Sequence, residues 1–172
     1  MKKMALAQYH KAQATPVFEW PVRVYWEDTD AGGIVFYANY LKFFERARTE
    51  WLRDLGLGQQ ALRDATDGMF VVTDVQLKYL RSARLDDRLC VTVCTQEAGR
   101  ASVTLYQQVW RWSDAALPPA LGTPGKVSAS TDRTLLCDGT VRLGWVQAST
   151  LKPQRLPTGV LQALLGTSPQ KT

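Results

Sequence analysis

The chain has 172 residues, of which 45% are hydrophobic and 22% charged, a composition typical of one globular domain and not of a disordered or fibrous protein. Its net charge of +5 includes no run of five like charges, which disfavours a nucleic-acid-binding tail. No apolar segment approaches the roughly 20 residues that cross a bilayer, and the first residues lack the apolar region of a signal peptide. We therefore expect a cytoplasmic protein without membrane insertion or nucleic-acid binding.

The few cysteine and histidine residues limit the kinds of catalytic and metal-binding site that this chain can form. Cys90, Cys94 and Cys137 include no Cys-x-x-Cys pair, which disfavours a disulfide framework or a zinc finger. The single histidine, His10, lies in the polar start of the chain, so a Ser-His-Asp triad or a His-rich metal site in the core is excluded. An enzyme with this sequence has carboxylates, hydroxyls and backbone dipoles to work with, and we expect no metal and no cofactor.

The first half of the chain predicts one strand and one long helix. Residues 1–16 form an N-terminal tail, and the alternation of Val22, Val24 and Trp26 predicts a half-buried strand over 21–27. A loop over 28–40 leads into a helix that we expect from Asn39 to Leu55, with Asn39 as its N-cap. Its charged residues, Arg48 among them, mostly flank or oppose one apolar face. That face consists of Tyr40, Phe43, Phe44, Ala47, Trp51 and Leu55.

The second half is dominated by strands, after a short helix or loop over 59–67. Alternation and β-branched residues predict four strands, over 70–80, 88–97, 101–112 and 127–138. A Pro- and Gly-rich loop insertion separates the last two, over 113–126. Asp138-Gly139 is a hairpin signal, so 141–146 is either a fifth strand or the return of that hairpin.

These elements predict an α+β fold, an antiparallel sheet of about five strands wrapped around one long central helix. Short connections favour meander pairing of consecutive strands. We expect one domain over 17–165, followed by a C-terminal tail over 166–172.

The densest cluster of chemically useful residues lies between the first strand and the helix, in Glu27-Asp28-Thr29-Asp30-Ala31-Gly32-Gly33. A carboxylate beside the free N–H groups of a helix start is sufficient to hydrolyse an activated acyl group. The carboxylate serves there as a base toward water or as a nucleophile. The alternative is structural, since Asp28 and Asp30 are also residue types that cap turns.

The stretch VRVYWEDTDAGGIVFYANYLKFFERARTEWLRDLG, residues 22–56, closely resembles the signature of hotdog-fold acyl-CoA thioesterases of the 4-hydroxybenzoyl-CoA thioesterase type. The resemblance continues through ARLDD at 83–87 and LKPQRLP at 151–157 and covers roughly residues 18–165. It is greatest for the branch associated with the Tol–Pal system, the YbgC-like proteins. That branch usually has His where this chain has Tyr37, whereas the 4-hydroxybenzoyl-CoA branch has Tyr there.

The resemblance implies a set of site residues. Asp30 is the catalytic carboxylate, and the backbone N–H groups around Tyr37 and Ala38 bind the oxyanion. Gly32, Gly33 and Val35 would contact the substrate. Three arginines, Arg81, Arg84 and Arg88, either meet the phosphates of coenzyme A or are solvated loop charges.

The resemblance also implies an activity and partners. We expect a thioester hydrolase that converts a short-chain aliphatic or aromatic acyl-CoA to a carboxylate and CoA. Sheets of two subunits would join in a homodimer with sites at the interface, and homotetramers are frequent in the family. Acyl carrier protein is an alternative acyl donor. The competing hypothesis is a non-catalytic hotdog module that binds acyl-CoA or acyl carrier protein.

Overall fold

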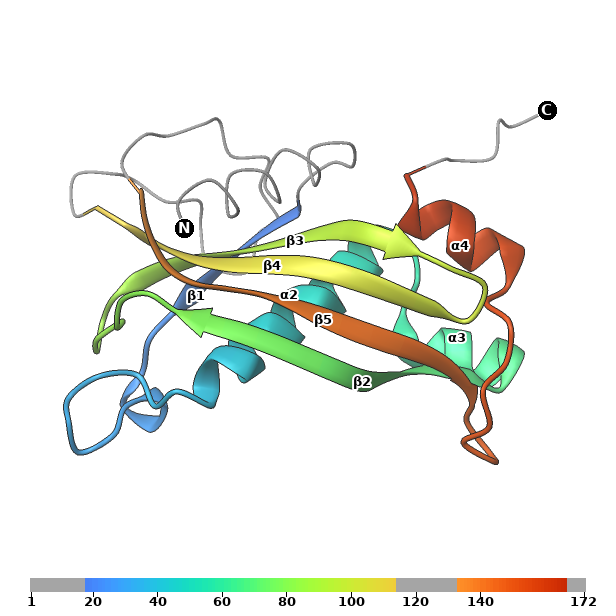
Figure 1. The fold of residues 1–172 in the computed structure, drawn as a ribbon, viewed down its shortest axis with the longest axis horizontal. Coiled ribbons are helices and arrows are strands. Elements are labelled where there is room, and N and C mark those ends of the chain that lie inside the picture. The colour runs from blue at the N-terminus through green and yellow to red at the C-terminus, as the bar shows by residue number, and fades with distance from the viewer. Residues whose placement is uncertain (1–17, 114–132, 167–172) are drawn as a thin grey trace.

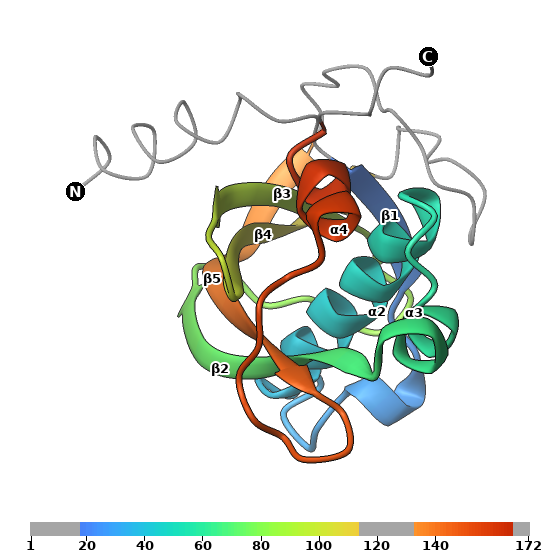
Figure 2. The same cartoon turned by 90° about the vertical axis from the view of Figure 1, so that its right-hand side faces the viewer.

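The computed structural model describes residues 18–113 and 133–166. Five antiparallel strands form one sheet in the order β1-β3-β4-β5-β2, and the sheet curves around the long helix α2, Asn39–Asp54 (Figures 1 and 2). The strands are β1 (Phe18–Arg23), β2 (Gly68–Tyr79), β3 (Arg88–Ala98), β4 (Ser102–Trp112) and β5 (Arg133–Gln147). The expected α+β hotdog architecture is confirmed. The N-terminal tail, residues 114–126 of the expected insertion and residues 167–172 lie outside the described residues.

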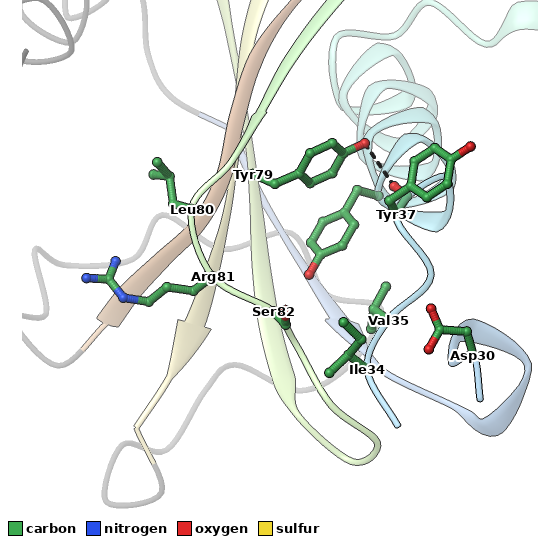
Figure 3. A pocket seen from close by; sticks show the side chains of 9 residues that line it. Asp30, Ile34, Val35, Tyr37, Tyr79, Leu80, Arg81 and Ser82 are labelled. Atoms are coloured by element: carbon green, nitrogen blue, oxygen red, sulfur yellow. Dashed lines mark hydrogen bonds between the residues drawn. The ribbon is translucent and has the colours of Figure 1, made fainter. Parts of the chain in front are cut away.

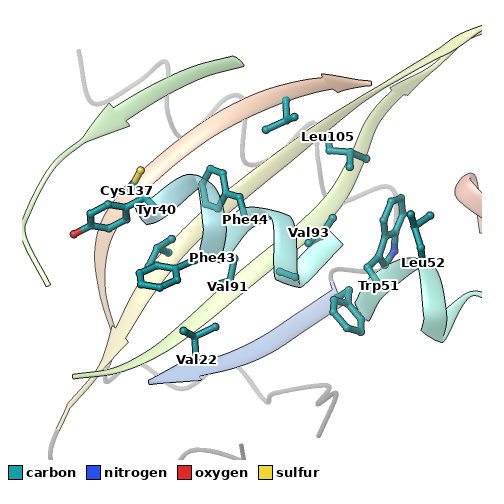
Figure 4. Packing of buried hydrophobic residues seen from close by; sticks show 14 of the residues in the cluster. Val22, Tyr40, Phe43, Phe44, Trp51, Leu52, Val91, Val93, Leu105 and Cys137 are labelled. Carbon is teal, nitrogen blue, oxygen red and sulfur yellow. The ribbon is translucent and has the colours of Figure 1, made fainter. Parts of the chain in front are cut away.

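Helix α2 lies in the curve of the sheet because its apolar face is wide and aromatic. Phe43, Phe44 and Ala47 are completely buried, and Tyr40 and Trp51 nearly so, as their helical spacing predicted. They pack with residues from the strands, among them Val91, Val93 and Leu105 (Figure 4). Burying one phenylalanine side chain stabilises the fold by about 1.5–3 kcal/mol, so this face supplies much of the core energy.

Three shorter helices complete the described fold. A 3₁₀ turn, η1, covers Trp26–Asp28, and α3 covers Gln59–Thr66 just after α2. At the C-terminal side α4, Thr158–Leu164, lies against β3, where the Thr95 hydroxyl donates to the Leu164 carbonyl at 2.8 Å. No helix in the described ranges is long and apolar enough to span a membrane.

The start of the fold differs from the sequence prediction. Strand β1 begins at Phe18 and ends at Arg23, whereas alternation had predicted 21–27, and Trp26 is 79% exposed on η1. Pro21 is tolerated inside the strand because β1 is an edge strand of the described sheet, with a strand partner on one side only. Asn39 is the first residue of α2 and not its cap, and its buried side chain instead donates to the Asp28 carbonyl at 2.9 Å.

The predicted hairpin at Asp138-Gly139 is also wrong, because β5 runs through this dipeptide without turning. Gly139 pairs with Leu77, and a Cβ atom on it would lie 2.2 Å from the carbonyl oxygen of Gln76. The glycine therefore permits close approach of β2 and not a chain reversal. Residues 127–132 of the predicted fourth strand lie outside the described residues.

Meander pairing holds only for β3, β4 and β5. Strand β2 pairs with β5 at the far side of the sheet, and β1 pairs with β3. Strand β2 is thus an edge strand, and its last residue, Tyr79, reaches the start of α2. This meeting of the β2 end with the α2 start positions the candidate site.

Candidate active site

A cavity of about 430 Å³ opens between the loop before α2, the start of α2 and the segment that follows β2 (Figure 3). Its lining combines one carboxylate with aromatic, aliphatic and a few polar side chains. The lining residues are Asp30, Ile34, Val35, Tyr37, Tyr40, Tyr79, Leu80, Arg81 and Ser82.

Asp30 sits in a tight turn that presents its carboxylate to this cavity. The backbone N–H of Asp30 donates to the Ile34 carbonyl at 3.0 Å, and the Gly33 N–H donates to the Asp30 carbonyl at 3.0 Å. One carboxylate oxygen, Oδ1, accepts the Gly32 N–H at 2.8 Å, which fixes the side chain. The other oxygen has no protein partner in the described chain and is left for water or substrate.

The two glycines of this turn shape it but do not line the cavity. Gly33 has φ +71°, a left-handed conformation that side chains disfavour. A Cβ atom on Gly32 would lie 3.0 Å from Oδ1 of Asp30. Gly32 and Gly33 thus help to present the carboxylate, and their expected contact with substrate stays a prediction.

Asp28 has a different environment, although it lies only two residues away. Its side chain is 1% exposed, and Oδ2 accepts the Tyr25 N–H at 2.9 Å. Its carbonyl oxygen accepts the Phe36 N–H at 2.9 Å and the Asn39 side-chain amide at 2.9 Å. Asp28 therefore holds the loop against the start of α2, which is the structural role that sequence reasoning left open for both aspartates.

The segment that leads into α2 leaves backbone donors unused. The N–H of Asn39 donates to the Phe36 carbonyl at 2.8 Å, and the N–H of Val35 donates to Ala83 at 2.9 Å. Between them, the N–H groups of Tyr37 and Ala38 have no acceptor within the described residues. Free N–H groups at a helix start carry partial positive charge and are suited to bind a developing negative charge.

The Tyr37 side chain has no polar partner in the described chain. It is 64% exposed, and its hydroxyl points away from Asp30 in Figure 3. Its ring contacts the rings of Phe36, at 4.6 Å between centroids, and Tyr79, at 6.4 Å. The Tyr37 hydroxyl is therefore not placed to act together with Asp30, and the backbone N–H remains as the candidate donor of this residue.

Two tyrosines that sequence reasoning missed complete the wall, the buried Tyr40 and the more exposed Tyr79. The Tyr40 hydroxyl accepts the Ala83 N–H at 2.9 Å, and the Tyr79 hydroxyl donates to the Tyr37 carbonyl at 3.0 Å. Burial raises the pKa of both phenols, so both remain protonated at neutral pH. Tyr40 was identified only as a core residue, and no local signal relates Tyr79 to a residue 42 positions earlier.

The three arginines expected to meet the phosphates of coenzyme A differ in their position relative to the cavity. Arg81 lines the cavity, and its side chain donates to the Leu135 carbonyl at 3.2 Å. Arg84 is exposed and Arg88 half-buried, and neither lines the cavity. Of the residues expected at the site, the structure brings together Asp30, Val35, Tyr37 and Arg81, with Ala38 adjacent through its backbone. Among the described residues no group of three or more His, Cys, Asp and Glu side chains could hold a metal ion.

This arrangement combines a fixed carboxylate, unused backbone donors and a cavity with apolar and aromatic walls. The carboxylate can accept a proton from water or attack an electrophile, and the donors can stabilise an oxyanion. Such a set suits acyl transfer to water.

Comparisons with known proteins point to the same class of reaction. Residues 32–116 match the family described as Thioesterase superfamily. The chain is 37% identical over 146 residues to the acyl-CoA thioesterase YbgC of Haemophilus influenzae, covering 85% of this chain and 93% of that protein. A probable thioesterase from Bartonella henselae has a similar structure, with a TM-score of 0.64, 27% identity, and coverage of 81% of this chain and 98% of that one.

A 4-hydroxybenzoyl-CoA thioesterase variant, solved with 4-hydroxybenzoyl-CoA, shares the fold. Its TM-score is 0.72 at 16% identity, and the alignment covers 87% of this chain and 99% of that chain.

Proposed function

The chain belongs to the thioesterase superfamily as an acyl-CoA thioester hydrolase, and we propose that it performs this hydrolysis with Asp30 and the N–H groups of Tyr37 and Ala38. One observation supports the proposal: Asp30, whose fixed carboxylate has one unpaired oxygen, lines the same cavity as Tyr37, and the N–H groups of Tyr37 and the next residue, Ala38, have no acceptor in the described chain. The YbgC relatives, at 33–37% identity, support the reaction class.

In the proposed reaction the thioester carbonyl oxygen accepts hydrogen bonds from the Tyr37 and Ala38 amides. Water attacks the carbonyl carbon while its proton passes to the Asp30 carboxylate. The tetrahedral intermediate then expels the sulfur of coenzyme A, which takes that proton back, and the acid is released. Every group in this route belongs to the chain, the substrate or water, so it requires neither a metal nor a redox cofactor.

A second route uses the same groups. Asp30 attacks the carbonyl carbon itself, sulfur leaves, and water cleaves the resulting mixed anhydride. A single turnover in water labelled with heavy oxygen tests for the second route. Label recovered in Asp30 excludes the general-base route, and label confined to the product acid excludes cleavage of the anhydride at the Asp30 carbonyl.

We assign the remaining binding roles by position. Arg81 on the cavity wall is the candidate for the inner part of the CoA chain or its phosphates, with Arg84 and Arg88 farther out. The acyl group, a short aliphatic or an aromatic one, would occupy the space among Ile34, Tyr40 and Tyr79. Either coenzyme A or acyl carrier protein would carry it, in the cytoplasm.

We also propose that two copies of the chain associate along β2. Within one chain β2 pairs only with β5, so its outer edge is unpaired among the described strands. Exposed apolar side chains lie along it, at Val72, Val75 and Tyr79. Pairing two such edges joins the sheets of a homodimer, and two dimers would form a homotetramer. Sedimentation of the full chain as a monomer at micromolar concentration would contradict this.

The function is tested by measuring free thiol released from a panel of acyl-CoAs, from acetyl through long aliphatic chains to benzoyl and 4-hydroxybenzoyl. Asp30→Asn should lower kcat by at least about 10²-fold, the lower end for loss of a general base. Asparagine keeps an oxygen that can accept the Gly32 N–H, so the turn should persist. Glu27→Gln, which neutralises an exposed carboxylate three residues earlier, is the matched control and should retain kcat.

Two outcomes would contradict the proposal. Turnover of Asp30→Asn within a few-fold of wild type would remove Asp30 from the mechanism. Tight binding of every acyl-CoA without turnover by the wild type would favour the non-catalytic binding module.

A further inference from the structure

The hydroxyl of Tyr79, at the end of β2, donates a hydrogen bond to the backbone carbonyl oxygen of Tyr37 at 3.0 Å (Figure 3). The Tyr79 ring stands edge-on to the rings of Tyr37 and Tyr40, with centroid distances of 6.4 Å and 5.5 Å. These contacts hold the phenol in place at the cavity wall. The hydrogen bond therefore joins an edge strand to the peptide group at the helix start.

The carbonyl of Tyr37 and the N–H of Ala38 belong to the same peptide group. No other donor to this carbonyl occurs in the described chain, and the N–H of Leu41, four residues later, bonds to the Ala38 carbonyl at 3.1 Å instead. A hydrogen bond to an amide oxygen polarises the whole amide and makes its N–H a stronger donor. It also fixes the plane of the peptide and hence the direction of that N–H.

We propose that Tyr79 is a positioning residue, whose hydroxyl orients and polarises the 37–38 peptide so that the Ala38 N–H binds the oxyanion. This inference rests on the proposed function, because it requires that the Ala38 N–H contact the thioester oxygen. Tyr79 itself touches neither the reacting carbon nor the water. The raised pKa of its phenol keeps the donor protonated at working pH.

The competing explanation is that this hydrogen bond only holds β2 against the loop before α2. Measuring kcat and KM of a variant without the hydroxyl separates this explanation from the positioning role. Removing an oxyanion donor lowers kcat by about 10²–10³, and polarisation strengthens a bond by about 10–30%. Tyr79→Phe, which keeps the ring contacts, should therefore lower kcat roughly 2- to 8-fold and leave KM nearly unchanged. Butyryl-CoA and benzoyl-CoA serve as the two substrates.

Tyr106→Phe is the matched control. It also removes a phenolic hydroxyl with a protein partner, since Tyr106 donates to Asp138 at 3.2 Å, but Tyr106 does not line the cavity. Its kcat should equal that of the wild type. Circular dichroism of both variants checks that the fold persists.

A spectroscopic measurement gives an independent readout. In the slow Asp30→Asn background, benzoyl-CoA with carbon-13 at the thioester carbonyl should show a lower carbonyl stretching frequency bound than free. Adding Tyr79→Phe should return part of that shift, because the Ala38 N–H becomes a weaker donor. A merely structural bond leaves the frequency unchanged.

The outcomes of the two proposals are distinguishable. An unchanged kcat in Tyr79→Phe together with an unchanged carbonyl frequency overturns the role of Tyr79 while leaving Asp30 as the base. A raised KM at constant kcat also overturns it, since the hydroxyl would then contribute to substrate binding and not to the transition state. Wild-type turnover by Asp30→Asn contradicts the proposed base instead, and the kinetic effect of Tyr79→Phe remains measurable in the wild-type background.

Discussion

Arg48 and Gln107 form a buried polar contact between α2 and β4, and replacing them separately and together tests what anchors the helix. The Arg48 guanidinium donates to Gln107 Oε1 at 2.9 Å, and Gln107 Nε2 donates to the Phe44 carbonyl at 3.1 Å. Gln107 is 0% exposed and Arg48 is 9% exposed. Burial lowers the pKa of Arg48, while the nearby Glu45 carboxylate acts in the opposite direction.

The expected energies follow from which partner is left unpaired. Gln107→Leu strands a buried guanidinium, and loss of a hydrogen bond to a charged group costs about 1.5–3 kcal/mol. Arg48→Met leaves the Gln107 oxygen unpaired, at a cost of about 1–3 kcal/mol. In the double variant both side chains are apolar and of similar size, and only the hydrogen bond from Gln107 to the Phe44 carbonyl is lost, so it should lie within about 1.5 kcal/mol of the wild type. The sum of the two single losses should therefore exceed the loss in the double variant by at least about 1 kcal/mol, which is the coupling energy of the pair.

The assay is urea unfolding followed by tryptophan fluorescence, at one fixed protein concentration so that any self-association is constant. The four proteins form a double-mutant cycle, in which equal m-values establish comparable unfolding. Single effects that add within about 0.5 kcal/mol would refute the reasoning, because they would mean that Arg48 and Gln107 stabilise the fold independently.

Two further changes test the fold at other points. Gly139→Ala should lower the free energy of unfolding in urea by about 1–3 kcal/mol, because its Cβ would lie 2.2 Å from the β2 backbone. Gly159→Ala is the control: with open space around it, it should be neutral or stabilising by about 0.5–1 kcal/mol. Equal losses in the two variants would contradict a steric clash at Gly139. Hydrogen bonds from Ser149 and then Gln147 hold the pKa of Asp67 below its usual value. A lowered folded pKa stabilises above the unfolded value of about 3.9, and that stabilisation is lost as pH falls through the folded pKa. The urea midpoint of the wild type should thus fall more between pH 5 and pH 2 than that of Asp67→Asn. If the two midpoints fall equally with pH, Asp67 does not contribute to the pH dependence of stability.

The sequence alone determined the elements whose information is local. The helical spacing of Phe43, Phe44, Ala47 and Trp51 identified both α2 and its buried face, because a helix must bury a continuous apolar stripe. Alternation located β3 and β4 to within a residue. The Asp30 loop and its helix start were found in the same way, since carboxylate, glycines and helix lie together along the chain.

The tertiary structure decided the features that depend on distant residues. Asp138-Gly139 has the local signal of a turn, but pairing with both β2 and β4 keeps β5 extended through it. Arg48 was expected away from the apolar face, yet it is buried because Gln107 on β4 supplies a partner that no helical pattern reveals. The contact of Tyr79 with Tyr37 exists only because β2 crosses to the edge of the sheet beside the start of α2. Local periodicity specifies which face of an element is buried, whereas the partner that it meets there is set by how the whole chain packs.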